Sequence, residues 1–547
     1  MLWAVSSAPH RDAGGIGGSA SQHAPATGVG NSSQLRAQPL NDRDWVREFE
    51  QSRGRPLRVL HVGNIANNAY LNAKFLRGIG VECHVLCFDY YDRFATPEWE
   101  DGNGVRRPRW FVQGPFRRCA AYLDAALSER RWQRWFRWHR LSLARAFQTR
   151  LTTGRTLPSI RFWAVVARYK LRFARSWLWS LTRFLTRRTL RLVGFNIKEP
   201  RVGDPAEVDL NDEPAELEVN ASPERQRLVK RFVEAFPARR DSLSLADFAA
   251  WDRAPDVWRG LFERYDIVQC YATEPIRALL AAKRPYVAYE HGTLRDFTMG
   301  DDPTHRLNAL AYRDSDHVFI TNGDCLSFAE ALGIPRFSPM VHPVDIDQHE
   351  RDLGEEPRRL RDSLGADVLL LCPLRHDWAI KGTDIHIRAL PRIVEENAGR
   401  VVMVLTTWGA QVDESARLIS ELGCGRYVKW LPPLDRLGLI THMKAADVLL
   451  DQMVLPHFGA TAPQGLAAGV PVIMSYRPES TEWIVDEPAP ILAAFDPDGV
   501  AEAVRTALDP AWRREFALRA REWVHRYHHP NRVVIEHCRV YRQLLER

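Results

Sequence analysis

The stretch ADVLLDQMVLPHFGATAPQGLAAGVPVI, residues 446–473, decides the fold class that we expect for this chain. It has the pattern of a strand, a glycine loop, a helix of small residues and a second buried strand. The first strand, 448–450, is a continuous apolar run that ends at Asp451, which is typical of a parallel strand covered on both faces. Ligands bind at that end of the strands in an open α/β sheet. The helix expected from about Thr461 would direct free N–H groups at an anion, so the unit predicts a phosphate or nucleotide site.

Two series of short apolar strands predict an α/β protein with two doubly wound, Rossmann-like domains facing each other across a cleft. The first domain is expected over 55–345 and the second over 346–525, because Pro and acidic residues replace the apolar periodicity near 339–365. A C-terminal helix over 526–547 is expected to pack back toward the first domain. The strands are expected at 55–63, 81–88, 265–270, 285–292 and 316–322, and then at 368–377, 401–409, 427–431, 448–450 and 471–475.

Two regions differ from these domains in composition. Residues 1–54 are rich in Gly, Ser, Ala, Pro and Gln, so they are expected to form a disordered N-terminal tail that buries too little apolar surface to fold. Residues of about 110–200 are expected to form a basic helical insert in the first domain, followed by an acidic linker at 204–224. Within the insert, residues 117–194 contain nineteen Arg or Lys and only two acidic residues, which predicts a local anionic partner.

The insert has the pattern of an interfacial helix. On a helical wheel, residues 162–184 place aromatic and aliphatic side chains on one stripe and arginines on its flank. We therefore expect residues 117–194 to bind an anionic membrane surface. The alternatives are a pair of core helices packed on the first domain and a surface for a protein partner. Nucleic acid is not expected, because the aromatic stripe is helical and is not interleaved on a sheet.

The remaining composition indicates a soluble protein in a reducing compartment. No apolar run approaches the roughly 20 residues that span a bilayer. The N-terminus has no basic region followed by an apolar core, so a cytoplasmic protein is expected, peripheral on the inner face of the cell membrane. The eight cysteines are scattered without a C-x-x-C pair, which indicates neither a disulfide framework nor a zinc site.

A second segment supplies the cations that an anionic ligand needs. In PLRHDWAIKGTDIHIRALP, residues 373–391, Arg375 and Lys381 flank the turn from a strand end into a helix, and Gly382 permits a close approach. Arginine can bind two phosphate oxygens at once while lysine acts as a point charge, and both stabilise the negative charge that grows on a departing diphosphate. These residues therefore predict a diphosphate site. The alternative is a pair of ordinary surface cations.

The segments RHDWAIKG and HFGATAPQGLAAGVPV, together with the two-domain plan, resemble the retaining glycosyltransferases of the GT-B fold, in particular the family-four group. The resemblance covers about 55–547 except the insert. It implies that Arg375 and Lys381 bind the diphosphate of a nucleotide-sugar donor. It also implies retention by front-face substitution, in which the leaving phosphate helps to deprotonate the incoming hydroxyl.

The chain departs from that family at two glutamates that the family places eight residues apart around a Phe-Gly pair. Here these positions hold Pro456 and Gln464. The amide of Gln464 can still bond a ribose hydroxyl, and Asp451, Gln452 or His457 are candidates for contacting the donor sugar. The remaining donor-site candidates follow from their place in the loop: Phe458, Gly459, Ala460 and Thr461.

The first domain contributes candidates at its own strand ends. His291 follows a strand and is expected beside the transferred sugar, where it would donate a hydrogen bond or stabilise developing charge. Its neighbour Glu290 is an acceptor-side candidate. The loop after the first strand offers Gly63, Asn64, Asn67 and Asn68 for the donor phosphate or the acceptor, and the acceptor side is completed by Asp89, Tyr90, Tyr91, Trp99, Glu100 and Asp101.

These residues together predict a glycosyltransferase that moves a sugar from a nucleotide-sugar donor to an acceptor hydroxyl. A saccharide or lipid-linked acceptor is expected, in polysaccharide or glycolipid synthesis at the membrane surface. No Asp-x-Asp signature stands in a donor position, so neither a metal nor another cofactor is expected. The alternatives are a soluble enzyme acting on a small molecule or a protein, and a non-catalytic scaffold that binds membrane or a partner through the insert.

Overall fold

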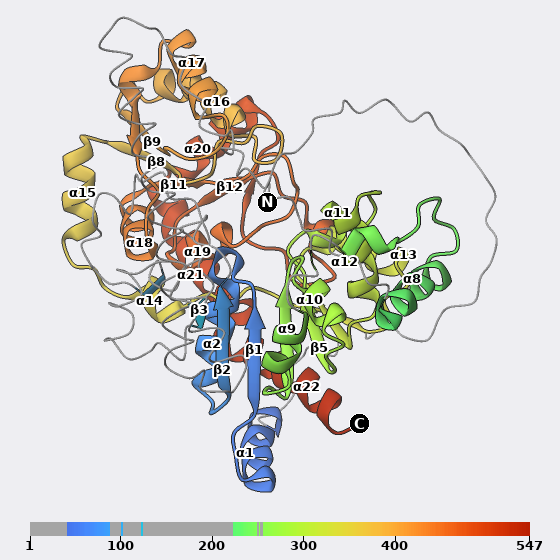
Figure 1. Cartoon of the computed structure of the whole chain (residues 1–547). Helices are drawn as coiled ribbons and strands as arrows, with labels where there is room; N and C mark the ends of the chain where they lie inside the picture. The colour runs from blue at the N-terminus through green and yellow to red at the C-terminus, as the bar shows by residue number, and fades with distance from the viewer. Residues whose placement is uncertain (1–40, 88–99, 102–121, 124–221, 249–250, 252–254) are drawn as a thin grey trace, which may run out of the picture.

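The computed structural model describes residues 41–87, 100–101, 122–123, 222–248, 251 and 255–547, and these residues form two α/β domains (Figure 1). Each domain is built on one sheet whose strands are parallel, apart from β3, which pairs antiparallel with β2. The N-terminal sheet runs in the order β3 (Tyr122–Leu123), β2 (Glu82–Cys87), β1 (Arg58–Val62), β4 (Ile267–Tyr271), β5 (Tyr286–Tyr289), β6 (His317–Ile320) and β7 (Phe337–Pro339). The C-terminal sheet runs in the order β10 (Val428–Leu431), β9 (Val401–Thr406), β8 (Val368–Cys372), β11 (Val448–Leu450), β12 (Val472–Met474) and β13 (Leu492–Ala493). The predicted fold class, two Rossmann-like doubly wound domains, is confirmed.

The strand order places a topological switch point in each sheet. In the C-terminal sheet, β9 and β10 lie on one side of β8, and β11 lies on the other. The loops that follow β8 and β11 therefore leave their strands in opposite directions, and the crevice between them is where doubly wound folds bind ligands. In the N-terminal sheet the corresponding point lies between β1 and β4.

The helices that follow these strands cover both sheets. In the N-terminal domain they are α1 (Asn41–Arg53), α2 (Asn68–Arg77), α8 (Pro223–Ala235), α9 (Pro255–Phe262), α10 (Pro275–Leu280), α11 (Thr293–Asp296), α12 (Pro303–Arg313) and α13 (Leu326–Ala331), with 3₁₀ turns at η2 (Ile65–Asn67), η5 (Leu245–Phe248) and η6 (Gly323–Cys325). In the C-terminal domain they are α14 (Ile346–Glu350), α15 (Glu356–Leu364), α16 (Thr383–Glu396), α17 (Val412–Glu421), α18 (Arg436–Ala445), α19 (Thr461–Ala467), α20 (Pro497–Ala507), α21 (Pro510–Tyr527) and α22 (Pro530–Leu545), with η7 (Gly425–Tyr427) and η8 (Pro478–Ser480).

The central strands are buried on both faces. All five residues of β4 and all three residues of β11 are buried. Because successive side chains of a strand point to opposite faces, this burial requires helices on both sides of each sheet. Both sheets are therefore internal layers, and two polar residues inside the central strands, His61 and Gln269, are hydrogen-bonded to buried tyrosines.

The prediction of a disordered tail over 1–54 is wrong for residues 41–53. These residues form α1, which packs against α22. Trp45, Val46 and Phe49 lie on one side of the helix and are at most 8 % exposed. Few apolar residues suffice here, because helical spacing gathers them on one face and a distant helix covers them. Residues 1–40 lie outside the described part of the chain.

The C-terminal helix also differs from the prediction of 526–547. The segment is split, because α21 ends at Tyr527 and α22 begins at Pro530, with His529 as its N-cap residue. Proline is favoured in the first turn of a helix and ends a preceding one, which explains the break. Helix α22 packs on α1 and α2 of the N-terminal domain and so connects the two domains.

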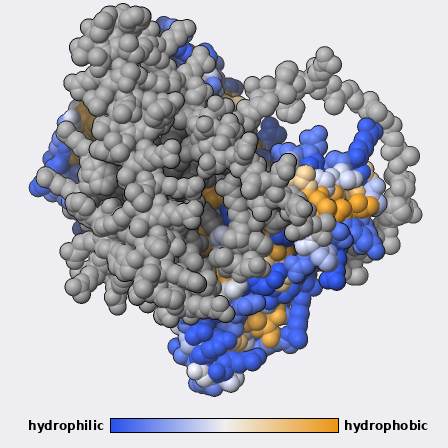
Figure 2. Space-filling view, in the orientation of Figure 1, coloured by the Kyte–Doolittle hydropathy of each residue, from blue (hydrophilic) through white to orange (hydrophobic). Residues whose placement is uncertain are grey.

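Most of the predicted insert, 110–200, and of the acidic linker, 204–224, lies outside the described residues. The exceptions are β3 at the edge of the N-terminal sheet and the start of α8. None of the helices in the described part of the chain is long and apolar enough to cross a membrane. In the view of Figure 2 the described surface is largely hydrophilic, with separate apolar areas among the polar ones.

Candidate active site

The C-terminal switch point brings together the two segments that the sequence singled out. Strands β8 and β11 are direct neighbours, with Val448 beside Leu370 and Leu449 beside Leu371. Arg375 follows β8 and Asp451 follows β11, so the loops that carry them emerge side by side. The backbone N–H of Met453 donates to the carbonyl of Lys381 at 2.8 Å, which ties the second loop to the first.

Gly382 is required where the first loop enters α16. Its φ is +63°, in the left-handed region that favours glycine. A Cβ at this position would lie 2.9 Å from the Cβ of Met453. Any larger residue would therefore separate the two loops.

Lys381 is connected to the loop after β11 through Gln452. Its Nζ donates to Oε1 of Gln452 at 2.5 Å, and Nε2 of Gln452 donates to the carbonyl of His457, also at 2.5 Å. Gln452 is 2 % exposed, so both the oxygen and the nitrogen of its side-chain amide are bonded inside the protein. The ammonium group of Lys381 and the loop 452–457 are thus held in one geometry.

Burial moves the pKa values of Lys381 and Asp451 toward their neutral forms. Desolvation lowers the pKa of Lys381 from its ordinary value, and the charge of Asp451 opposes that change. Desolvation raises the pKa of Asp451, and the charge of Lys381 opposes it. Oδ1 of Asp451 accepts a hydrogen bond from the N–H of Gln452 at 2.8 Å, whereas Oδ2 has no partner among the described residues. The site therefore has a cation whose solvation is incomplete, which favours binding of an anion.

Arg375 lies in the same loop as Lys381 and is one-third exposed. Its guanidinium pairs with Asp377 at 3.1 Å. Its Nε is buried and has no hydrogen-bond partner among the described residues. Arg375 can therefore present further N–H groups to an oxyanion without breaking a bond.

Gln464 lies on α19 and is bonded to a residue that the sequence analysis missed. Its Oε1 accepts a hydrogen bond from Arg436, the first residue of α18. Arg436 also pairs with Glu100 through two hydrogen bonds of 2.8 and 2.9 Å. No local pattern marks Arg436, because its carboxylate partner lies 336 positions away and in the other domain.

The other candidates of the loop before α19 differ in their surroundings. The ring of Phe458 packs edge-on against Trp523 at 5.6 Å and lies near Tyr476 and His528, so its side chain belongs to the core and not to a ligand site. Gly459 has open space around a hypothetical Cβ, which leaves room for a ligand beside the backbone. Thr461 begins α19, and Ala460 is its N-cap residue.

Pro456, in the place of the family's first glutamate, has a structural role. Its carbonyl accepts the N–H of Arg477 at 3.0 Å and the hydroxyl of Ser480 at 2.5 Å. The loop before α19 is thereby attached to η8. The side chain of Pro456 cannot replace the missing carboxylate.

His291 lies at the end of β5 in a group of stacked rings. It is parallel to His342, with an interplanar angle of 7° and ring centroids 5.2 Å apart, and it also lies against Tyr271 and Tyr289. Burial, and then the charge of His342, keep the pKa of His291 well below its ordinary value. Its Nε2 is buried without a partner among the described residues. The neutral ring can exchange a hydrogen bond with a sugar hydroxyl, but it does not supply the positive charge that the sequence analysis considered.

Glu290 does not have the acceptor-side role that the sequence suggested. It is fully buried, and its carboxylate accepts hydrogen bonds from the backbone of Gly292, from Thr321, from Asn322 and from the thiol of Cys325. All of these donors lie in the segments that follow β5 and β6. Glu290 therefore holds these two strand ends together and has no face left for a substrate.

The loop after β1 is mainly bonded within itself. Nδ2 of Asn64 donates to Oδ1 of Asn67 at 2.9 Å, and Oδ1 of Asn64 accepts the N–H of Tyr70 at 3.0 Å. Gly63 has a φ of +86°, and a Cβ there would lie 2.9 Å from Cγ of Glu274. Asn68 begins α2 and is 3 % exposed. These residues shape the loop, and a ligand would meet mainly its backbone.

The remaining acceptor-side candidates fall into two groups. Asp89, Tyr90, Tyr91 and Trp99 lie outside the described residues. Asp101 accepts hydrogen bonds from Tyr70, Lys74 and Gln348 at 2.5 to 2.8 Å, so it links α2 to α14 at the domain boundary.

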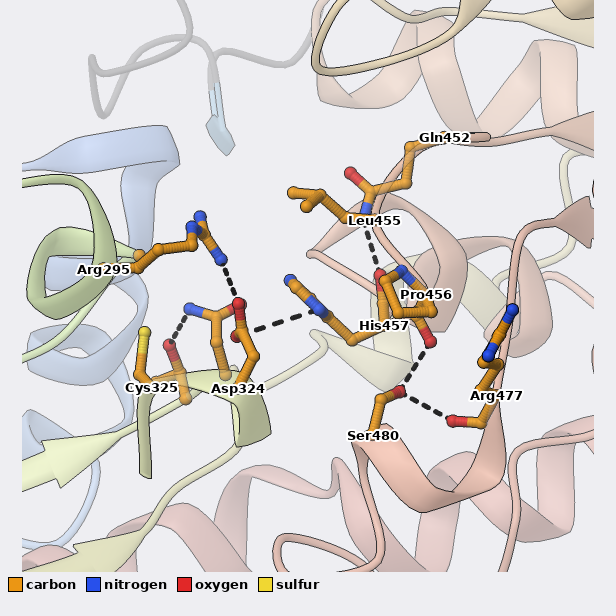
Figure 3. A network of polar contacts seen from close by, with 12 residues as sticks. Arg295, Asp324, Cys325, Gln452, Leu455, Pro456, His457, Arg477 and Ser480 are labelled. Carbon is orange, nitrogen blue, oxygen red and sulfur yellow. Dashed lines mark hydrogen bonds and ion pairs between the residues drawn. The ribbon is translucent and has the colours of Figure 1, made fainter. Parts of the chain in front are cut away.

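A network of polar contacts crosses between the domains beside Gln452 (Figure 3), the residue that accepts the hydrogen bond of Lys381. Arg295 and Asp324 of the N-terminal domain form an ion pair, and Oδ1 of Asp324 lies 3.8 Å from Nδ1 of His457 in the C-terminal domain. The pKa of His457 is lowered, because desolvation outweighs the charge of Asp324. Gly323 lies so close to η8 that a Cβ would be 2.1 Å from the carbonyl oxygen of Ser480. The two domains are therefore in direct contact at the site.

Part of the chain is similar in sequence to known glycosyltransferases. Residues 367–510 match the family model described as glycosyl transferases group 1. The chain is 25 % identical over 304 residues to an uncharacterized glycosyltransferase of Methanocaldococcus jannaschii, covering 52 % of this chain and 77 % of that one. It is 29 % identical over 163 residues to the D-inositol 3-phosphate glycosyltransferase of Acidothermus cellulolyticus, covering 28 % of this chain and 36 % of that one.

Solved structures with a similar arrangement have low sequence identity to the chain. Anabaena HepE in complex with UDP is 18 % identical, with a TM-score of 0.44, and the similarity covers 53 % of this chain and 82 % of that one. Sucrose-phosphate synthase of Thermosynechococcus elongatus is 16 % identical, also with a TM-score of 0.44, and covers 54 % of this chain and 80 % of that one.

Proposed function

Because residues 367–510 belong to the group 1 glycosyltransferases, we propose that this chain transfers a sugar from a nucleotide-sugar donor to an acceptor hydroxyl. That match confirms the predicted enzyme class, a glycosyltransferase. The retaining mechanism stays a prediction. The observation that carries the proposal is the convergence of Arg375, Lys381 and the loop after β11 at the switch point of the C-terminal sheet. The identities of the donor and acceptor are part of the proposal.

Arg375 and Lys381 would bind the donor diphosphate. Transfer breaks the bond between the anomeric carbon and the diphosphate, so negative charge grows on the leaving oxygen. A buried ammonium and a guanidinium stabilise that charge better than water-exposed cations would, because the local dielectric constant is low. We propose that these two cations make a divalent metal unnecessary.

The loop after β11 would hold the sugar and ribose parts of the donor. Gln452 and His457 lie between Lys381 and the N-terminal domain, where a sugar attached to the diphosphate would extend. Gln464 is proposed to bond the ribose. The neutral His291 is proposed to bond a sugar hydroxyl from the opposite domain. Retention of configuration by front-face substitution is proposed from the family resemblance.

The acceptor is proposed to be a saccharide or lipid-linked saccharide at a membrane surface. This part of the proposal rests on the sequence of residues 117–194, with its nineteen basic and two acidic residues. Liposome flotation with and without anionic lipid tests it, using the full chain and a variant that lacks 117–194. Equal flotation of the two proteins would contradict a membrane role for the insert.

A thermal-shift screen with UDP, GDP, ADP and their sugars tests the donor site. We expect one nucleotide class to stabilise the wild type and to lose most of this effect in Lys381→Ala, because the bound diphosphate loses one of its two proposed cations. Lys283→Ala is the matched control, since Lys283 is also partly buried and donates to one oxygen, the carbonyl of Tyr265, at 2.7 Å. Absence of any nucleotide effect in the wild type would contradict the proposed function.

A further inference from the structure

Arg436 joins the two domains at the residue proposed to bind the ribose. It begins α18 and is 9 % exposed. Glu100 of the N-terminal domain, 3 % exposed, accepts two hydrogen bonds from it, at 2.8 and 2.9 Å. A third guanidinium N–H donates to Oε1 of Gln464, which is 8 % exposed. The three side chains thus form one buried chain of hydrogen bonds.

This chain of bonds determines which end of the Gln464 amide faces outward. A guanidinium has five N–H donors and no acceptor, so the amide atom that faces it must be the carbonyl oxygen. Nε2 of Gln464 is then the end that remains, and the one side-chain hydrogen bond that Gln464 makes among the described residues is the bond to Oε1. Rotating the amide by a half-turn would place two N–H donors against a cation.

We propose that Arg436 is a positioning residue that holds Gln464 as a hydrogen-bond donor to a ribose hydroxyl oxygen of the nucleotide. Glu100 holds Arg436 in turn, by a bidentate ion pair of fixed direction. The inference rests on the proposed function, because it assumes a nucleotide beside α19. It differs from binding by a carboxylate at this position, which would accept a hydrogen bond from the ribose hydroxyl and donate none.

The arrangement also links ribose recognition to the position of the N-terminal domain. Glu100 is the only carboxylate that the structure pairs with Arg436 among the described residues. Removing it leaves a buried guanidinium that is bonded only to a neutral amide, which is unfavourable. The guanidinium would then reorient, and Gln464 would lose its fixed orientation.

The test compares binding of a nucleoside diphosphate with binding of its 2′-deoxy and 3′-deoxy forms, by calorimetry. The base is the one that the wild type selects among UDP, GDP and ADP. We expect the wild type to prefer the ribose form over at least one deoxy form by about tenfold, the effect of one hydrogen bond. Gln464→Leu should abolish the preference, and Arg436→Met should reduce it at least threefold.

Two further variants separate positioning from general stability. Arg361→Met is the matched control, because Arg361 is paired with Asp447 at 2.8 Å within the C-terminal domain, and its loss should lower Tm without changing the preference. Arg436→Lys keeps one N–H donor for the Gln464 carbonyl and should restore part of the preference. If Arg436→Met does not fold, Glu100→Gln provides the comparison, since it preserves size and removes the ion pair.

The outcomes distinguish this inference from the function on which it rests. A wild type that binds none of the three nucleoside diphosphates would overturn the proposed function and the inference with it. A wild type that binds one of them, with the same ribose preference in Arg436→Met, in Glu100→Gln and in Arg361→Met, would overturn the inference alone. A preference lost in the first two variants and kept in the third would support it.

Discussion

Replacing Glu290 by glutamine should destabilise the N-terminal domain, although the two side chains have nearly the same size. The carboxylate is fully buried, and each of its oxygens faces hydrogen-bond donors. Oε1 accepts from the N–H of Gly292 and from the thiol of Cys325, and Oε2 accepts from Thr321 and Asn322. An NH₂ group in place of Oε1 will face the N–H of Gly292 and the thiol of Cys325. In place of Oε2 it will face the N–H of Thr321 and the NH₂ of Asn322, where the Thr321 hydroxyl is the one group that can accept from it.

The magnitude follows from the number of donors that lose their acceptor. Two donors are affected in either orientation of the amide, and a buried donor without a partner costs about 1–3 kcal/mol. Removing a buried charge offsets part of this cost, because burial raises the pKa of Glu290 above its ordinary value. We therefore expect a loss of about 2 kcal/mol in the free energy of unfolding, or roughly 4–8 °C in Tm.

The effect should depend on pH with a defined sign. Because the pKa of Glu290 is raised in the folded protein, its contribution to stability is complete below the ordinary glutamate pKa of about 4.3 and is lost as pH rises through the raised value. The Tm difference between wild type and Glu290→Gln should therefore be larger at pH 5 than at pH 8. Thermal unfolding followed by circular dichroism at both pH values measures it.

The control is Glu274→Gln, at the end of the neighbouring strand. Glu274 accepts one side-chain hydrogen bond, from Arg277 at 2.6 Å, and is more exposed, so a Tm change below about 2 °C is expected. A Glu290→Gln protein with the Tm of the wild type and a raised KM for the acceptor would refute the reasoning. In that case Glu290 would have the acceptor-side role that the sequence suggested.

Three further predictions concern other parts of the molecule. Burial lowers the pKa of Lys381, so kcat/KM should fall on the alkaline side at a pH below the ordinary lysine pKa of about 10.4. Lys381→Arg should move this fall to higher pH. An identical pH profile of kcat/KM in both proteins would show that Lys381 does not control the fall. Trp45→Ala should cost about 3–5 kcal/mol of stability, because Trp45 is buried where α1 packs on α22. A Tm within 1 °C of the wild type would show that residues 41–53 do not form a stable part of the fold. Gly323→Ala should lower kcat/KM at least tenfold in steady-state assays, because a Cβ would displace Ser480 across the domain contact, and full activity would show that this contact opens freely.

The sequence was sufficient for those features that depend on local pattern. Continuous apolar runs identified strands such as β11 and β12, because a parallel strand covered on both faces needs apolar side chains on both. Arg375, Lys381 and Asp451 were found because polar residues at strand ends interrupt these runs. The order of strands in a doubly wound sheet then brings such strand ends together.

Predictions from local composition were wrong where the contacts come from distant segments of the chain. Residues 41–53 contain few apolar residues, yet α1 is folded because α22, some five hundred residues later, covers its apolar face. Glu290 and His291 stand next to each other in the sequence, but only one of them has an atom left for a ligand. Their different roles follow from which side of β5 each side chain occupies and from the donors that β6 provides.

The sequence by itself determined the two-domain class, the similarity of residues 367–510 to the group 1 glycosyltransferases and the cations of the proposed donor site, because each depends on local sequence patterns. Only the tertiary structure decided how the proposed donor-site residues are oriented. Gln464 is held by Arg436, and Arg436 by a carboxylate from the other domain. The physical reason is that a buried polar group must find partners wherever the fold brings them, and sequence distance does not limit that choice.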